Sequence, residues 1–134
     1  EFRRVLFRSL LRALSGVAKE QIFDPPADQR FEHLSHIVSG DFQRKRPEDV
    51  SGTGYVIDCL EAALWAFWHT DNFRAAILAA ANLGDDADTT AAICGQIAGA
   101  HYGKAGIPED WLKMLYRATD IESIAIRLAD GPQA

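Results

Sequence analysis

The chain has 134 residues, of which 48% are hydrophobic and 25% are charged, and this is typical of one soluble globular domain. A formal net charge of −5 argues against a nucleic-acid-binding surface, which needs clustered lysine and arginine, and no apolar run approaches the roughly 18 residues of a membrane span. The two cysteines, Cys59 and Cys94, lie in apolar helical patterns and favour two buried thiols in a cytoplasmic protein over a disulfide.

The first nine residues, EFRRVLFRS, begin without methionine and carry three arginines. One interpretation is an arginine-rich transit peptide. We favour a cloning junction or another non-native leader over residues 1–9, because Glu-Phe is what a common restriction site encodes and no small-residue cleavage site follows. We therefore expect residues 10–134 to be the C-terminal part of a single domain.

The rest of the chain predicts helices, since no stretch shows the sustained alternation of a β-strand. Residues 31–40 have a helical pattern, and a long polar loop is expected over residues 40–54. Residues 53–70 place apolar side chains at spacings of three and four. This spacing predicts an amphipathic helix of about 15 residues.

A second helix is expected over residues 72–83, capped by Thr70 or Asp71 and ended by Gly84. Further helices are expected over residues 87–102, 109–118 and 121–130. The fold class is therefore all-α. In the helix over residues 87–102, Gly95 and Gly99 form a face almost without bulk, so we expect a neighbouring helix to approach it closely.

The stretch GDDADTTAA, residues 84–92, places three aspartates within four positions. One interpretation is helix capping, because Asp and Thr satisfy free amide groups and complement the helix dipole. One aspartate would suffice for that. The other interpretation is a site for a hard divalent cation, which prefers carboxylate and neutral oxygen ligands. It requires Asp86, in the loop before the helix, to converge with Asp88 and the Thr89 hydroxyl.

The string from Asp86 to Thr90 also fits the D-x-D-x-T signature of haloacid-dehalogenase-like phosphatases, in which the first Asp is a nucleophile and the cation is magnesium. That signature requires a buried β-strand running into the first Asp. The preceding residues, ILAAANLGD, are alanine-rich and helix-like, so this interpretation is disfavoured.

The longer string NLGDDADTTAAICGQIAGAHYG, followed by GIPEDWLKML, resembles the C-terminal part of the ADP-ribosylglycohydrolase family. The upstream segment SGTGYVIDCLEAALWAF is similar to a second segment of the same family. The resemblance covers roughly residues 10–130. His101 stands where the family more often has an aromatic residue, and we expect it to have a structural role.

The resemblance implies an all-α domain that holds two magnesium or manganese ions. Asp86, Asp88 and Thr89 match the C-terminal metal ligands of the family, and Gly54 and Tyr55 match a region near the bound ADP-ribose. The implied activity is hydrolysis of the glycosidic bond between ADP-ribose and a protein side chain. The implied partner is an ADP-ribosylated protein or an ADP-ribose-type small molecule, with neither nucleic acid nor a membrane.

One element of the family pattern is absent from this sequence. The family completes its two-metal site with a Thr-Asp-Asp triplet in its N-terminal half, and no such triplet occurs here. We therefore expect this chain to be inactive alone, with an apolar cluster of Trp65, Phe67 and Trp68 exposed. The alternative is a family member that is not catalytic and binds ADP-ribose or serves structurally, as crystallin relatives do.

Overall fold

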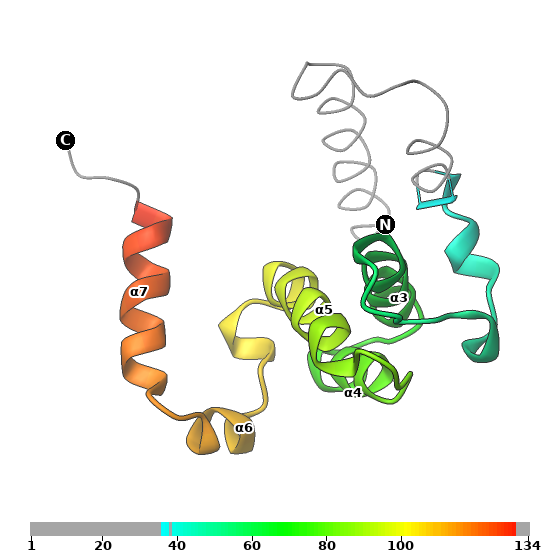
Figure 1. Ribbon diagram of the computed structural model, residues 1–134. Coiled ribbons are helices and arrows are strands. Elements are labelled where there is room, and N and C mark those ends of the chain that lie inside the picture. The colour runs from blue at the N-terminus through cyan, green and yellow to red at the C-terminus, as the bar shows by residue number, and fades with distance from the viewer. Residues whose placement is uncertain (1–35, 38, 131–134) are drawn as a thin grey trace.

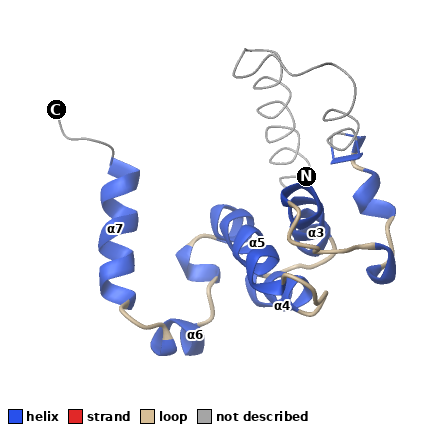
Figure 2. Cartoon of the chain, in the orientation of Figure 1, coloured by secondary structure: helices blue, strands red, loops and turns tan. Residues whose placement is uncertain are grey.

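The computed structural model describes residues 36–37 and 39–130, so the predictions for residues 1–9 lie outside the described part (Figure 1). This part is helical and contains no β-strand (Figure 2), which confirms the all-α class. Its elements are η1 (Asp41–Arg44), η2 (Pro47–Asp49), α3 (Val56–Trp68), α4 (Phe73–Ala81), α5 (Ala87–Tyr102), η3 (Lys104–Gly106), α6 (Glu109–Met114) and α7 (Ala118–Asp130). None of these helices has the length and apolar character needed to cross a membrane.

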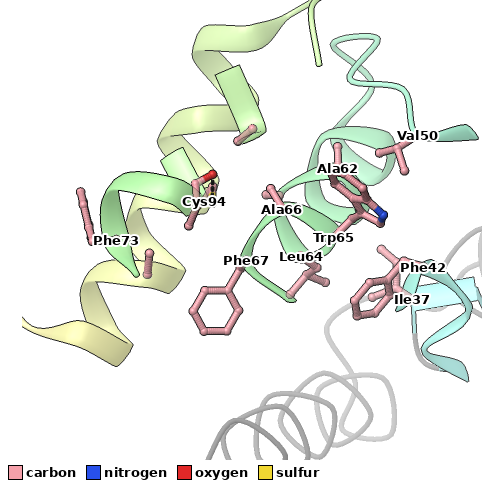
Figure 3. Packing of buried hydrophobic residues seen from close by; sticks show 14 residues of the cluster. Ile37, Phe42, Val50, Ala62, Leu64, Trp65, Ala66, Phe67, Phe73 and Cys94 are labelled. Carbon is pink, nitrogen blue, oxygen red and sulfur yellow. Dashed lines mark hydrogen bonds between the residues drawn. The ribbon is translucent and has the colours of Figure 1, made fainter. Parts of the chain in front are cut away.

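Helices α3, α4 and α5 pack against one another and form the core (Figure 1). Residues 62–67 of α3 are all buried, so the second half of this helix is covered on every side rather than along one stripe. The short η1 packs on α3 through Phe42, which is fully buried (Figure 3). The loop predicted over residues 40–54 therefore contains two 3-10 turns, and one of them contributes to the core.

The prediction that Thr70 or Asp71 caps the second helix is wrong. The N-cap of α4 is Asn72, whose side-chain oxygen accepts a hydrogen bond from the Ala75 backbone N–H at 2.8 Å. The Thr70 hydroxyl instead donates to the Ala66 carbonyl oxygen at 2.8 Å. Thr70 therefore satisfies a free carbonyl at the end of α3, where the last turn leaves carbonyl groups without helical partners.

The fourth predicted helix is shorter than expected, and the fifth begins earlier. Helix α6 ends at Met114 rather than at residue 118, and α7 begins at Ala118 rather than at residue 121. The two are separated by Leu115, whose backbone is extended, and by Arg117, whose φ of 56° lies in the left-handed region, which a helix cannot pass through. The Arg117 guanidinium lies 2.7 Å from the Asp120 carboxylate in the first turn of α7.

The predicted close approach to the glycine face of α5 is not found. A Cβ built at Gly95 would meet the Ile77 Cδ1 atom at 3.6 Å, an ordinary van der Waals distance, and no described atom would lie within 4 Å of one at Gly99. A single added Cβ at Gly95 would therefore meet only the end of the Ile77 side chain.

The aromatic cluster expected at the surface is largely buried. Trp65 is 7% exposed and Phe67 is 6% exposed. The Trp65 indole N–H donates to the Lys45 carbonyl oxygen at 2.9 Å, and this bond ties the loop after η1 to α3. Six of the ten exposed large hydrophobic side chains in the described part follow α6. Four of these six lie on α7, which extends away from the bundle (Figure 1).

Both cysteines are buried and unpaired. Burial raises the pKa of the Cys94 thiol to about 11, and its sulfur lies 3.5 Å from the Ala76 carbonyl oxygen (Figure 3). Because both cysteine side chains are fully buried, and because the thiolate is the reactive form of Cys94, we expect neither thiol to react with iodoacetamide at pH 8 in the folded chain. Mass spectrometry after a short exposure should show no adduct without denaturant and two adducts in guanidinium chloride. Rapid labelling of Cys94 in the folded chain would contradict its burial.

Candidate functional site

The candidate site begins at the turn between α4 and α5. Gly84 has a φ of 82° and Asp85 a φ of 52°, so two successive residues adopt the left-handed conformation, which glycine and aspartate tolerate best. The Asp85 carboxylate accepts a hydrogen bond from the Ser51 hydroxyl at 3.1 Å. The first of the three aspartates is therefore engaged in holding the turn against the loop before α3.

Asp86 is the N-cap residue of α5, but its side chain makes no capping hydrogen bond. Its backbone N–H donates to the Gly52 carbonyl oxygen at 2.9 Å. Its carboxylate lies beside Gly54, where the Asp86 Oδ2 atom is 3.1 Å from the position that a Cβ of residue 54 would occupy. Asp86 therefore occupies the position of a cap, whereas its carboxylate does not bond to the amide groups of the first turn.

Asp88 lies in the first turn of α5 and is exposed. A hydrogen bond with the Asp86 carboxyl is the main cause that lowers the pKa of Asp88, followed by the Thr89 backbone N–H, which donates to Asp88 Oδ1 at 3.0 Å. The structure therefore brings the Asp86 and Asp88 carboxyl groups together at the surface. Thr89 follows in the same turn and is also exposed.

The oxygen ligands at this turn are of the kind that magnesium and manganese prefer. Few ligand side chains gather at this turn. Within residues 36–37 and 39–130, no group of three or more His, Cys, Asp or Glu side chains is arranged so that it could hold a metal ion. The donor type thus fits a hard cation, while Asp86, Asp88 and Thr89 amount to part of a coordination shell. That these three residues hold a metal stays a prediction.

Gly54 and Tyr55, the residues expected near a bound ligand, lie at the start of α3. Gly54 has a φ of 81° and contacts Asp86 as described above. Tyr55 precedes the first residue of α3 and is 50% exposed. The turn is held by Thr53, whose hydroxyl donates to the Asp58 carboxylate at 2.6 Å. Because it lies beside the Asp86 carboxylate, Gly54 borders the carboxylate pair.

The sequence did not predict the contacts of Ser51, Gly52 and Thr90, which join the two segments. Thr90 is fully buried, and its hydroxyl has no hydrogen-bond partner among the described residues. Its Oγ1 atom lies 2.7 Å from the position that a Cβ of residue 52 would occupy. These residues are separated by more than thirty positions, and no local pattern in the sequence indicates such a contact.

His101 lies near the opposite end of α5 from the carboxylate pair. Its ring packs edge-on against Phe67, with ring centroids 5.3 Å apart, and against Tyr102, with centroids 4.5 Å apart. This packing fits the structural role expected for His101.

The fold and the site together define an all-α protein whose central helix begins with two adjacent carboxylates. A family model described as ADP-ribosylglycohydrolase matches residues 3–134. The chain belongs to the ADP-ribosylglycohydrolase family, which confirms the resemblance found in the sequence.

Individual relatives agree with this assignment. An ADP-ribosylarginine hydrolase Tri1 of Serratia proteamaculans is 46% identical over 115 residues, covering 86% of this chain and 31% of that protein. The Tri1 protein of Pseudomonas putida is 41% identical over 131 residues, covering 97% of this chain and 35% of that protein. An ADP-ribosyl-[dinitrogen reductase] glycohydrolase of Rhodospirillum rubrum is 38% identical over 69 residues, covering 52% of this chain and 24% of that protein. The chain spans about a third of the length of the two Tri1 proteins.

Proposed function

We propose that this chain forms the C-terminal metal-binding part of a hydrolase that removes ADP-ribose from protein side chains. The observation that carries the proposal is the pair of carboxylates from Asp86 and Asp88, which lie together at the start of α5 in a chain of this family. Capping alone does not account for the pair, because the Asp86 side chain makes no capping hydrogen bond.

The chemistry follows from the charges at this turn. Asp86 and Asp88 would hold magnesium or manganese through their carboxylate oxygens, with Thr89 as a neutral oxygen ligand. A bound ion would supply Lewis-acid activation of water and would orient the hydroxyl groups of the ribose. The carboxylates would also stabilise the positive charge that develops on the sugar as the glycosidic bond breaks.

The substrate that we propose is a protein with ADP-ribose attached to arginine. Both Tri1 relatives are named ADP-ribosylarginine hydrolases, and they match most of this chain at 46% and 41% identity. In the proposed complex, Gly54 and the half-exposed Tyr55 contact the ADP-ribose, because Gly54 borders the carboxylate pair. We place the reaction in the cytoplasm, where the two free thiols would remain reduced.

We further propose that this chain does not turn over substrate by itself. Two carboxylates and one hydroxyl cannot fill the shells of two six-coordinate ions, and water would have to provide the remaining ligands. Such a site would bind manganese weakly, and it would enclose the ribose on one side only.

The experiment is an assay of ADP-ribose release from an ADP-ribosylarginine protein, with manganese or with EDTA. The chain is tested alone and mixed with the part of the Serratia proteamaculans relative that it does not match. We expect turnover only in the mixture and only with manganese. Robust turnover by the chain alone would contradict the partial site. A mixture that forms a complex and binds ADP-ribose without releasing it from protein would favour the non-catalytic alternative.

A further inference from the structure

We propose that Gly52 and Gly54 are positioning residues that fix Asp86, and that the contact between Gly52 and Thr90 holds the loop in place. This inference rests on the proposed function, since it explains how a carboxylate expected to bind metal is held at a defined position. Its structural basis is the loop formed by residues 51–54, which lies directly against the first turn of α5.

Three contacts join this loop to the segment that carries the aspartates. The Ser51 hydroxyl donates to the Asp85 carboxylate at 3.1 Å, and the Asp86 backbone N–H donates to the Gly52 carbonyl oxygen at 2.9 Å. The Asp86 Oδ2 atom lies 3.1 Å from the position that a Cβ of residue 54 would occupy, a close contact. The backbone and the side chain of Asp86 are therefore placed by two different glycines.

The closest approach is at Gly52. A Cβ at this position would lie 2.7 Å from Thr90 Oγ1, which is shorter than van der Waals contact, while its next neighbours, Thr90 Cβ and the Gly84 carbonyl oxygen, would be at 3.7 and 3.8 Å. A β-branched side chain in a helix has few χ1 rotamers, so Thr90 has little freedom to rotate away from such a contact. One oxygen atom thus decides whether residue 52 can carry a side chain.

The Thr90 hydroxyl lies in an environment that is unusual for a polar group. Its hydroxyl is fully buried and has no hydrogen-bond partner in the described part of the chain, an arrangement that is normally unfavourable. Its backbone N–H donates to the Asp86 carbonyl oxygen at 3.1 Å, so Thr90 contacts both the loop and the residue that the loop positions. The hydroxyl fills the space beside Gly52 and thereby sets the distance between the two segments.

The requirement for glycine is stricter at position 54 than at position 52, because two conditions act together. Its φ of 81° is one that other residues rarely adopt, and a Cβ there would be 3.1 Å from Asp86 Oδ2. An alanine would be strained in its backbone and would displace the carboxylate away from the loop. Gly54 is thus a positioning residue for Asp86 in addition to its proposed contact with the ligand.

The experiment compares amide hydrogen exchange at Asp86 among variants, with the Ala80 amide in α4 as an internal reference. We expect Gly52→Ala to speed exchange at Asp86 by about tenfold or more, because its bond to the Gly52 carbonyl is lost, while the reference changes less. Adding Thr90→Ala should restore slow exchange, since it removes the oxygen in conflict. Adding Thr90→Val should not, because a methyl group replaces that oxygen. Gly99→Ala, a glycine replacement with no described atom within 4 Å, should leave Asp86 unchanged.

A second measurement links the loop to metal binding. Manganese should broaden the NMR signals of residues 86–89 in the unsubstituted chain, and the manganese concentration for half-maximal broadening should rise about tenfold or more in Gly52→Ala and in Gly54→Ala. This manganese concentration should return toward its original value in the double variant that combines Gly52→Ala with Thr90→Ala.

The outcomes separate this inference from the proposed function. Unchanged Asp86 exchange in Gly52→Ala, or equal rescue by Thr90→Ala and Thr90→Val, would overturn the positioning role. If Gly52→Ala does not fold, rescue of folding by Thr90→Ala but not by Thr90→Val would support that role, and failure of both to rescue would overturn it. Absence of broadening in the unsubstituted chain would overturn the metal site of the proposed function, and the exchange rates would decide separately whether the loop holds Asp86.

Discussion

Replacing Asp88 by asparagine is expected to lower manganese-dependent release of ADP-ribose by at least about a hundredfold in the reconstituted mixture. The substitution keeps the size of the side chain and removes its negative charge, so it weakens the attraction of the Asp86–Asp88 pair for a cation. A bound metal contributes several kcal/mol of transition-state stabilisation, and a hundredfold loss corresponds to roughly 3 kcal/mol. The measurement is kcat/KM for the ADP-ribosylarginine protein at several manganese concentrations.

The matched control for this prediction is Asp85→Asn. Asp85 belongs to the same acidic stretch, but its carboxylate accepts a hydrogen bond from Ser51 and its φ is 52°. Asparagine tolerates this conformation and can still accept a hydrogen bond from the Ser51 hydroxyl, so we expect less than about a threefold change in kcat/KM. Equal losses in Asp85→Asn and Asp88→Asn would show that only the total charge of the turn matters.

Replacing Trp65 by alanine is expected to lower the free energy of unfolding by about 3–5 kcal/mol. Trp65 is 7% exposed, lies within the fully covered half of α3 and bonds to the Lys45 carbonyl oxygen at 2.9 Å. The alanine variant would lose the packing of the indole ring and would leave that carbonyl without its donor. Urea denaturation followed by circular dichroism measures the change.

Trp65→Phe separates the two contributions to this loss. Phenylalanine keeps most of the apolar contact but has no N–H group, so we expect a loss of about 1–3 kcal/mol from the unsatisfied Lys45 carbonyl. If Trp65→Ala and Trp65→Phe were equally destabilised, the hydrogen bond rather than the packing would carry the effect. Loss of less than about 1 kcal/mol in Trp65→Ala would contradict its place in the core.

The sequence by itself determined the fold class, the family and the bounds of α5. Helix α5 runs from Ala87 to Tyr102, as predicted, because both of its ends have local signals. The acidic turn after Gly84 precedes it, and Gly103, with a φ of 66°, follows it. Such signals act within a few residues, so they can be recognised without knowledge of the partner helices.

The bounds of other helices could not be predicted from the sequence, because more than one nearby residue could cap or end the helix. Thr70 is a good N-cap residue by type, yet its hydroxyl bonds to the Ala66 carbonyl oxygen and Asn72 caps α4 instead. The residues between Met114 and Ala118 carry no glycine or proline, and the extended backbone of Leu115 and the left-handed conformation of Arg117 separate α6 from α7. At the start of α4, Thr70 and Asn72 are both suitable caps by residue type, and only the structure shows which of them bonds to the helix.

Tertiary structure alone decided how the candidate site is held. The aspartates were evident in the sequence, but their separate roles were not: Asp85 bonds to Ser51, while Asp86 lies beside Gly54. In the loop before α3, Gly52 and Gly54 meet close neighbours from the segment that carries the aspartates, whereas Gly99 in α5 meets no described atom within 4 Å. A contact such as that between Ser51 and Asp85 joins residues 34 positions apart. It exists only because α3 and α5 pack together and bring their N-terminal segments side by side, which no periodicity within either helix encodes.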